Sequence, residues 1–464
     1  MRNEFYVIPP HLTWCPDSTC LVVTDSPGER QSDALFVISL ETGEKRQLTH
    51  PPSGAGDSNP AISSDGRSLV FRRNPNALFT GALYELALGR SLTPVGEPRR
   101  LTDPVLDAAY PTWMPRGKEI LFSRPVSGSL RRLVITGENM AERLPFVGED
   151  GIMPAVSHPL PSRRSRLVYV HSFQDQNIWR INTSAPGAPA SAPPAMSIAS
   201  TRQEGMPQLS PDGRRVAFWS DRSGENEIWL SDVDGGNPIQ LTFMGPGVRG
   251  YPHWSPDGRF IVFHSAFEGQ WDVFVIPASG GKARNLTSHP ANDFLPSFSR
   301  AGKWIYFNSN RSGEFRIWKM PASGGDPVQV KDAVGYAPQE SPDGAYLYYV
   351  QTFDAPSALW RVPVSGGLPV KMVETVVLAN FVVLQGGIYY IDRPSGQGDV
   401  HYFDLPSGTT RLQYFNFVTR KSTTVVPNLG AVDIPLTATA DGRMILFPRI
   451  DSSVDDLMLV ENFR

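Results

Sequence analysis

The sequence contains few cysteines, little net charge and no long apolar run. Only Cys15 and Cys20 occur in 464 residues, too few for a disulfide scaffold or a four-cysteine zinc site. The 43 Lys and Arg residues nearly balance the 46 Asp and Glu residues, whereas a nucleic-acid-binding domain normally has a basic face. No apolar run approaches the roughly 18 residues of a membrane span. We therefore expect neither direct nucleic-acid binding nor a membrane span.

Sequence motifs for common catalytic sites are also missing. The chain contains no G-x-S-x-G, no H-E-x-x-H and no G-x-x-x-x-G-K-[ST], and its histidines never lie three to five residues apart. The segment Gly245–Gly250 matches a dinucleotide fingerprint in letters only, because no βαβ unit surrounds it. These observations predict a chain with no catalytic residues, no cofactor and no metal.

The two cysteines flank a four-residue turn, Pro16–Thr19, and could therefore face each other across a hairpin. A disulfide needs both suitable geometry and an oxidising compartment. We interpret the two side chains as half-buried small apolar groups rather than as a disulfide.

A repeat of a little over forty residues is the strongest signal. SPDGRRVAFWS, SPDGRFIVFHS, SRAGKWIYFNS and SPDGAYLYYVQ place their glycines at Gly213, Gly258, Gly302 and Gly344, and weaker copies surround Gly66, Gly117 and Gly442. A proline recurs six residues before the glycine and an aromatic residue five residues after it. Each copy reads as four short strands joined by turns, of which PDG is the tightest. Four strands per repeat of this length predict the blades of a β-propeller.

We predict an all-β array of about ten four-stranded antiparallel blades. The Ala-, Pro- and Ser-rich segment Thr183–Met196 reads as a linker, and it divides an N-terminal part of about four blades (residues 1–194) from a six-bladed propeller (residues 195–464). The last repeat ends at DLMLVENFR without an outer strand. We expect Met196–Ser200 to close the six-bladed ring, and Phe5–Ile8 to be the outer strand of a first ring, complete or incomplete. A single ten-bladed ring is the alternative.

The repeat motifs resemble the TolB-like, WD-repeat-like β-propeller repeats of bacteria, best from Arg202 to Met372. More narrowly, LETGEKRQLT, SDRSGENEIW, SNRSGEFRIWKMPASGG and the ending DLMLVENFR resemble the C-terminal propeller region of winged-helix/TolB-like proteins. The resemblance implies protein or peptide partners and, for many members, a periplasmic location. It carries no DNA-binding role, because the winged helix is not part of this sequence. The first ten residues, MRNEFYVIPP, show no export signal, so the cytoplasm and the periplasm both stay open.

A binding rim is predicted at the mouth of the propeller channel. In a propeller, the loops that enter the innermost strands share one face with the loops between the second and third strands. Mixed charges stand nine residues before the turn glycine, at Asp57, Glu204, Arg249, Asp293 and Asp433, and aromatic residues stand beside them. Such a mixture suits protein binding, although the same residues could instead cap blades and satisfy loop amides. The predicted rim consists of Arg202, Glu204, Arg249, Tyr251, His253, His264, Asp293, Phe294 and Tyr336.

The favoured function is a non-enzymatic scaffold for protein or peptide recognition, as the sensor or interaction part of a larger bacterial regulatory or envelope protein. The alternative is the substrate-binding propeller of a hydrolase or lyase, such as a tricorn-like peptidase. A lyase would need a metal held by histidine and carboxylate groups, for which His253 with Asp293 is the candidate pair.

Overall fold

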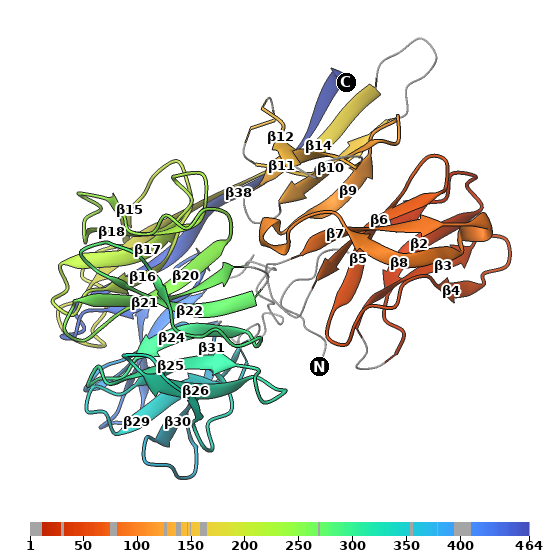
Figure 1. The fold of residues 1–464 in the computed structure, drawn as a ribbon. Coiled ribbons are helices and arrows are strands. Elements are labelled where there is room, and N and C mark those ends of the chain that lie inside the picture. Colours follow the sequence, from red (N-terminus) through yellow and green to blue (C-terminus); the bar gives the residue numbers. More distant parts are fainter. Residues whose placement is uncertain are drawn as a thin grey trace. The chain divides into compact units, whose positions relative to one another are not determined.

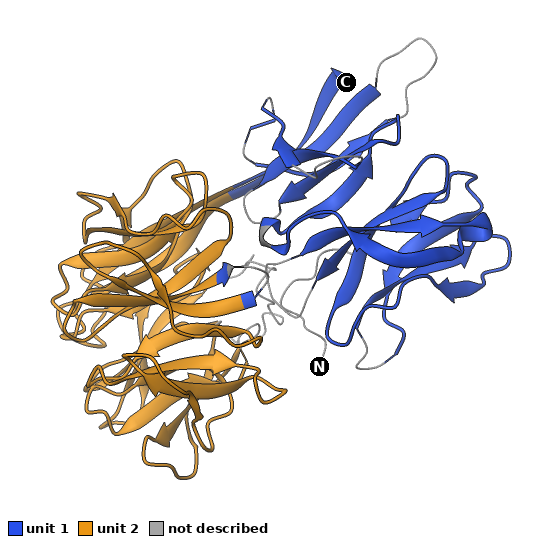
Figure 2. Ribbon diagram, in the orientation of Figure 1, with its two compact units in different colours: residues 1–173, 266–270, 453–464 blue, residues 174–265, 271–452 orange. Residues whose placement is uncertain are grey.

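The computed structural model is built almost wholly of antiparallel β-sheets (Figure 1). The structure describes residues 12–28, 32–74, 81–124, 128–135, 141–145, 147–148, 150–157, 165–267, 270–352, 356–377, 379–393 and 410–463. They form two compact units (Figure 2). Unit 1 comprises residues 1–173, 266–270 and 453–464, and unit 2 comprises residues 174–265 and 271–452. The predicted fold class is confirmed, whereas the predicted number of blades and the boundary between residues 194 and 195 stay predictions.

Unit 1 contains three four-stranded sheets in which consecutive strands pair. Two short 3-10 helices, η1 (Arg90–Leu92) and η2 (Pro104–Leu106), lie in its connections. The strands are β1 (Leu12–Trp14), β2 (Cys20–Asp25), β3 (Ala34–Ser39) and β4 (Lys45–Gln47); β5 (Gly56–Ile62), β6 (Ser68–Asn74), β7 (Ala82–Leu88) and β8 (Pro94–Arg100); and β9 (Ala109–Trp113), β10 (Glu119–Arg124), β11 (Ser129–Val134) and β12 (Ala141–Arg143).

Unit 2 contains five sheets of the same kind. Their strands are β16 (Glu204–Leu209), β17 (Arg215–Ser220), β18 (Glu227–Asp232) and β19 (Ile239–Gln240); β20 (Val248–Trp254), β21 (Phe260–Phe267), β22 (Gln270–Pro277) and β23 (Arg284–Asn285); β24 (Asp293–Phe298), β25 (Trp304–Ser309), β26 (Arg316–Pro321) and β27 (Val328–Gln329); β28 (Tyr336–Glu340), β29 (Tyr346–Val350), β30 (Ser357–Pro363) and β31 (Val370–Val376); and β32 (Phe381–Val383), β33 (Gly387–Asp392), β34 (Arg411–Asn416) and β35 (Ser422–Val426).

A ninth sheet has six strands and is built from both ends of the repeat array. Its long strands β14 (Ser165–Asn182) and β38 (Met444–Phe463) pair with each other. β13 (Gly151–Val156) and β15 (Ala195–Ile198) pair with β14, while β36 (Ala431–Val432) and β37 (Thr437–Ala438) pair with β38. β14 and β38 each run through both units, because the unit boundaries fall at residues 173/174 and 452/453.

The apolar cores lie between successive sheets. In unit 2, for example, Ala217 and Ile228 pack with Ile261 and Phe263 of the next sheet. A further core joins the ninth sheet to the first sheet of the unit, through Ile178, Ile198 and Leu446 with Leu209 and Phe218. The first strands also contact one another in sequence from β16 to β32, and β37 contacts both β32 and β16. The sheets of unit 2 therefore follow one another in a closed cycle.

Local sequence explains the repeated turn and the recurrent proline. In the turn after β16, Gly213 has a φ of 69°, and Asp212 Oδ1 accepts hydrogen bonds from Ser210 Oγ and the Arg214 N–H. In several first strands the residue before the proline also has positive φ, at 50° for Met206 and 52° for Leu295. The ladder register shifts at these points, so the proline lies at a bulge, where its missing N–H is tolerated.

The expectation of four short strands per repeat is wrong at two places. Residues 165–182 and 444–463 are each one continuous strand, where a second and a third strand joined by a turn are expected. The sequence between the second and third strands of each four-stranded sheet contains a glycine or a proline, whereas SFQDQ (172–176) and DSSVDD (451–456) contain neither. Without a residue that favours a tight turn, the extended chain continues.

The two halves of each of these strands belong to different units. In unit 2, β15 pairs antiparallel with β14 and is the outer strand of the sheet that contains Gly442's repeat, as expected for Met196–Ser200. Trp179 of β14 takes the place of the tryptophan in the third strand, and the Arg449 guanidinium lies over its ring at 3.2 Å. In unit 1, Phe463 of β38 is buried against Leu130 and Leu167. The other expected closing strand, Phe5–Ile8, lies outside the described residues.

The predicted linker is also packed. Thr183 is buried and donates through Oγ1 to the Gly442 carbonyl at 3.2 Å. The Gly187 N–H donates to Tyr389 Oη at 3.0 Å, and the Ala190 N–H donates to the Val425 carbonyl at 3.2 Å. The first bond holds the Ala- and Pro-rich segment to the turn between β37 and β38, and the other two hold it against the sheet β32–β35.

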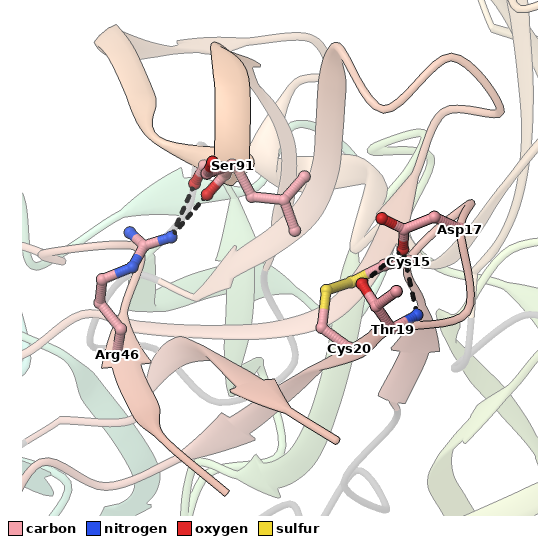
Figure 3. The surroundings of a disulfide bond; sticks show 7 residues. Cys15, Asp17, Thr19, Cys20, Arg46 and Ser91 are labelled. Carbon is pink, nitrogen blue, oxygen red and sulfur yellow. Dashed lines mark hydrogen bonds between the residues drawn. A yellow bond between two sulfur atoms is a disulfide. The ribbon is translucent and has the colours of Figure 1, made fainter. Parts of the chain in front are cut away.

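The interpretation of the cysteines as free side chains is wrong. Cys15 and Cys20 form a disulfide whose Cα atoms are 5.3 Å apart, inside the usual range (Figure 3). The β1–β2 hairpin creates this geometry, because the Cys15 N–H donates to the Cys20 carbonyl at 2.9 Å. Within the turn, Thr19 donates to Asp17 through both its backbone N–H and its hydroxyl (Figure 3).

The contribution of β38 to unit 1 predicts a stability effect at the chain's last residues. Phe463→Ala removes a buried ring and should lower the free energy of unfolding by about 3 kcal/mol. The control Leu459→Ala changes a side chain that is 56% exposed and should change it by less than about 0.5 kcal/mol. Chemical denaturation measures both. Equal, small effects would contradict the placement of Phe463 in the core.

Candidate functional site

Two of the predicted rim carboxylates are buried in ion pairs. Arg222 Nη2 donates to Glu204 Oε1 at 2.8 Å, and Arg311 Nη2 donates to Asp293 Oδ2 at 2.7 Å. Both carboxylates are fully buried. Burial raises the pKa of Glu204 and of Asp293, while the facing guanidinium lowers it. Each pair joins the start of a first strand to the residues that follow the second strand of the same sheet.

The arginines of these pairs also lie over aromatic rings. The Arg222 guanidinium is 5.3 Å from the Phe218 ring centre and 5.1 Å from that of Trp229. In the sheet β24–β27, Arg311 lies over Phe307 and Trp318 at 5.3 and 5.2 Å. A cation over aromatic faces is stabilised by their quadrupoles. We call the carboxylate, the arginine and its two aromatic rings the latch of a sheet.

Other sheets vary the latch. In unit 1, Arg73 forms a bidentate pair with Asp57 at 2.6 and 2.8 Å. The charge is reversed at Arg249, which is 1% exposed and lies 3.7 Å from a Glu227 carboxylate oxygen. Asp433 instead accepts a hydrogen bond from Gln176 Nε2 at 3.1 Å, and burial raises its pKa to about 6. Nine residues before the turn glycine, the charged side chain is therefore a structural group.

The two predicted rim histidines lie between sheets. His264 Nδ1 accepts a hydrogen bond from the Leu295 N–H at 3.1 Å. His253 Nδ1 lies 3.1 Å from the Trp254 carbonyl oxygen, to which a protonated Nδ1 donates. Burial lowers the pKa of His264 to about 3 and that of His253 to about 4, so both rings stay uncharged at neutral pH. Tyr251 stacks on His264 at 6.1 Å between ring centres.

A half-exposed aromatic patch lies on the same side of the sheets as the latches. Phe294 contacts Phe315 with ring centres 5.1 Å apart, and Tyr336 lies 6.3 Å from Phe294 and 6.0 Å from Phe315. Phe294 is buried, while Phe315 and Tyr336 are partly exposed. Phe315 follows the NRSG loop between β25 and β26. We call these three residues the aromatic patch.

The predicted rim is therefore only partly a surface. Phe294 and Tyr336 meet in the aromatic patch, and Tyr251 meets His264. Arg202, His253 and Tyr336 are half-buried, and the other predicted rim residues are buried: Glu204, Arg249, Tyr251, His264, Asp293 and Phe294. Phe315 was not predicted, although an aromatic residue two positions after the NRSG loop is a visible signal. The sequence gave no signal for Gln176 as the partner of Asp433, because the two residues come from distant repeats.

The two side chains of the candidate metal pair, His253 and Asp293, each have another partner. Asp293 is paired with Arg311, and His253 Nδ1 lies 3.1 Å from the Trp254 carbonyl. In the part of the chain that the structure describes, no group of three or more His, Cys, Asp or Glu side chains has an arrangement that could hold a metal ion. Within the same residues, no helix is long and apolar enough to cross a membrane.

The latch predicts that its arginine is needed for folding. Arg311→Ala leaves the Asp293 carboxylate buried without a counter-charge and should cost about 3–5 kcal/mol in the free energy of unfolding. Adding Asp293→Asn should recover part of this loss. The control Arg316→Ala breaks an exposed pair with Glu314 and should cost less than about 1 kcal/mol. Denaturant titration compares the variants, and equal losses at both arginines would contradict the latch.

The raised pKa of Asp433 predicts a pH-dependent stability. Because the folded-state pKa is about 6 and the ordinary value is 3.8, this group's contribution is fully present below that ordinary value and is lost as the pH rises through 6. Asp433→Asn should therefore unfold with a free energy about 1–3 kcal/mol higher than the parent at pH 8, and with nearly the same one near pH 4.

Asp212→Asn is the matched control. Hydrogen bonds from Ser210 and Arg214 lower the pKa of Asp212, so this substitution should not stabilise the protein at pH 8. Thermal unfolding of the parent and both variants between pH 4 and pH 8 measures these differences in stability. A stabilisation by Asp433→Asn that is the same at both pH values would contradict the assignment.

Comparison with known proteins identifies the family of the best repeats. Residues 199–367 match the family model of the TolB beta propeller domain. A search of curated proteins gave no match. Among solved structures, TolB from Acinetobacter baumannii is 13% identical with a TM-score of 0.41, covering 74% of this chain and 81% of that chain.

Two peptidase structures are also similar. The puromycin-hydrolyzing peptidase of Mycobacterium tuberculosis is 14% identical with a TM-score of 0.33, covering 87% of this chain and 57% of that one. Prolyl oligopeptidase B from Galerina marginata is 11% identical with a TM-score of 0.31, covering 87% and 54%. Identities and scores this low carry no functional argument. The family-model match over residues 199–367 agrees with the four-stranded antiparallel sheets of this region, which is similar to the TolB beta propeller domain.

Proposed function

We propose that this chain is a non-enzymatic β-propeller array that binds an extended segment of a partner protein through the aromatic patch of unit 2. In this proposal the chain is the interaction or sensor part of a larger bacterial regulatory or envelope protein. The supporting observation is the partly exposed pair Phe315 and Tyr336 on the buried base of Phe294. Aromatic residues held rigidly at a surface are the usual anchors of protein interfaces.

The latches support the patch. Asp293 and Phe294 are adjacent in β24, and the Asp293–Arg311 pair ties the start of that strand to the loop before Phe315. The patch is therefore ordered before a partner arrives, which lowers the entropy cost of binding. Arg316 and Glu314 flank Phe315 and form an exposed ion pair at 2.7 Å, so they supply a polar rim of both charges.

The sheet order supports a ring around the patch. We propose that the five four-stranded sheets of unit 2 and the ninth sheet are six blades of one closed propeller, with the sheets of unit 1 as a second array. The cyclic contacts of the first strands support this arrangement. The aromatic patch then belongs to two adjacent blades, because Phe294 lies in β24 and Tyr336 in β28.

Selection of linear peptides tests the proposed function. A phage-displayed random peptide library is panned on the purified full chain, and enriched peptides are titrated by fluorescence polarisation. Phe315→Ala/Tyr336→Ala should weaken binding by about 100-fold, since aromatic anchors cost about 2 kcal/mol or more when truncated. Val418→Ala, at a residue 90% exposed elsewhere in unit 2, should leave binding unchanged. Unchanged binding by the aromatic variant, or stoichiometric metal in the purified protein, would overturn the proposal.

A further inference from the structure

The outer edge of β38 in unit 1 is not part of the proposed peptide-binding site in unit 2. In unit 2 the ninth sheet runs from β36 and β37 through β38 and β14 to the outer strand β15. In unit 1 the corresponding order is β13, β14 and β38. Among the described strands, none pairs with the far edge of residues 453–463. Within the described part of the chain, the position that β15 fills in unit 2 therefore has no counterpart beside β38 in unit 1.

This edge lacks the protection that several other outer strands show. Natural outer strands are kept short, charged or interrupted by proline, which prevents pairing with other chains. Here β4 reads KRQ, β12 reads AER and β23 reads RN. In contrast, residues 452–459 of β38 are exposed on both faces. They include four large apolar side chains, with exposed fractions of 47% for Val454, 76% for Leu457, 41% for Met458 and 56% for Leu459.

The charges of the edge restrict its partner. Asp455 and Asp456 are exposed between the apolar residues, and Arg166 of β14 is already paired with Glu461 at 3.3 Å. A second copy of β38 would bring the same two aspartates of both chains into one short ladder, and like charges on paired strands repel. A strand with lysine or arginine residues between aliphatic ones satisfies both the charges and the apolar surface.

We propose that residues 453–459 of β38 are a strand-addition site for an extended, basic and aliphatic peptide segment of a partner protein. The added strand forms backbone hydrogen bonds with the outer edge of β38, and its basic side chains pair with Asp455 and Asp456. An antiparallel strand at the equivalent edge supports the proposal, because β15 pairs there through Ala195, Met196 and Ile198. The site is separate from the aromatic patch and does not depend on the proposed function.

A synthetic peptide tests the site directly. A fluorescein-labelled peptide of alternating lysine and valine is titrated into the full chain, with an alternating glutamate and valine peptide as its control. The first should bind saturably and slow backbone amide exchange in residues 453–459, and the second should not. Asp455→Lys/Asp456→Lys should weaken binding by about tenfold or more, as the loss of two cross-strand charge pairs requires.

Matched variants separate the outcomes. Leu368→Lys changes a side chain that is 87% exposed in unit 2 and should have no effect, whereas Leu457→Lys should weaken binding. Absence of saturable binding, equal binding of both peptides, or binding that survives the aspartate reversal overturns the proposal. So does binding that appears only after removal of residues 1–11, which would show the edge to be taken by the chain itself. A dimer in sedimentation that Leu457→Lys abolishes would assign the edge to a second copy.

Discussion

The pairing of β14 with β38 is the interaction on which the rest of the structure depends. Each of these strands supplies one half to unit 1 and one half to unit 2. A repeat array normally gains stability from contacts between neighbouring repeats, and here the sheet built on this pair makes the first and last repeats of unit 2 neighbours. Ile178 and Leu446, which share one core with Phe218, come from repeats more than 200 positions apart in the sequence. Closure is therefore a long-range event, and such contacts are slow to form.

The latches explain why charge recurs at the start of the first strands. A buried carboxylate is costly unless it is paired, and a buried pair is a weak source of net stability. Its geometric effect is larger: the Glu204–Arg222 and Asp293–Arg311 pairs fix the loop after the second strand against the first strand. Each of these guanidinium groups also lies over two aromatic rings. In these two sheets one arginine thus orders both the edge of the core and the adjoining surface.

Local periodicity predicted the fold class well, because turn glycines, bulge prolines and strand aromatics are all read within one repeat. The same periodicity misplaced residues 165–182 and 444–463, since a strand that continues and a strand that turns differ only in the few residues between them. It also predicted an exposed rim where Glu204 and Asp293 are buried. Their arginine partners lie 18 residues further along the chain, and sequence position alone does not show which charges are paired. The disulfide was missed because two nearby cysteines suit both interpretations.

The exchange of strands also sets where the paired strands have outer edges. Two strands are shared between two units, and the pair has two outer edges, one on β14 and one on β38. β15 covers the first edge because it lies only a short connection before β16, the next first strand of the same unit. Among the described strands, none pairs with the second edge. Phe463 is buried in the core of unit 1, so the end of β38 is held in place beside that edge. A rigid strand with an accessible edge costs little entropy to pair, which distinguishes it from a frayed end of the chain.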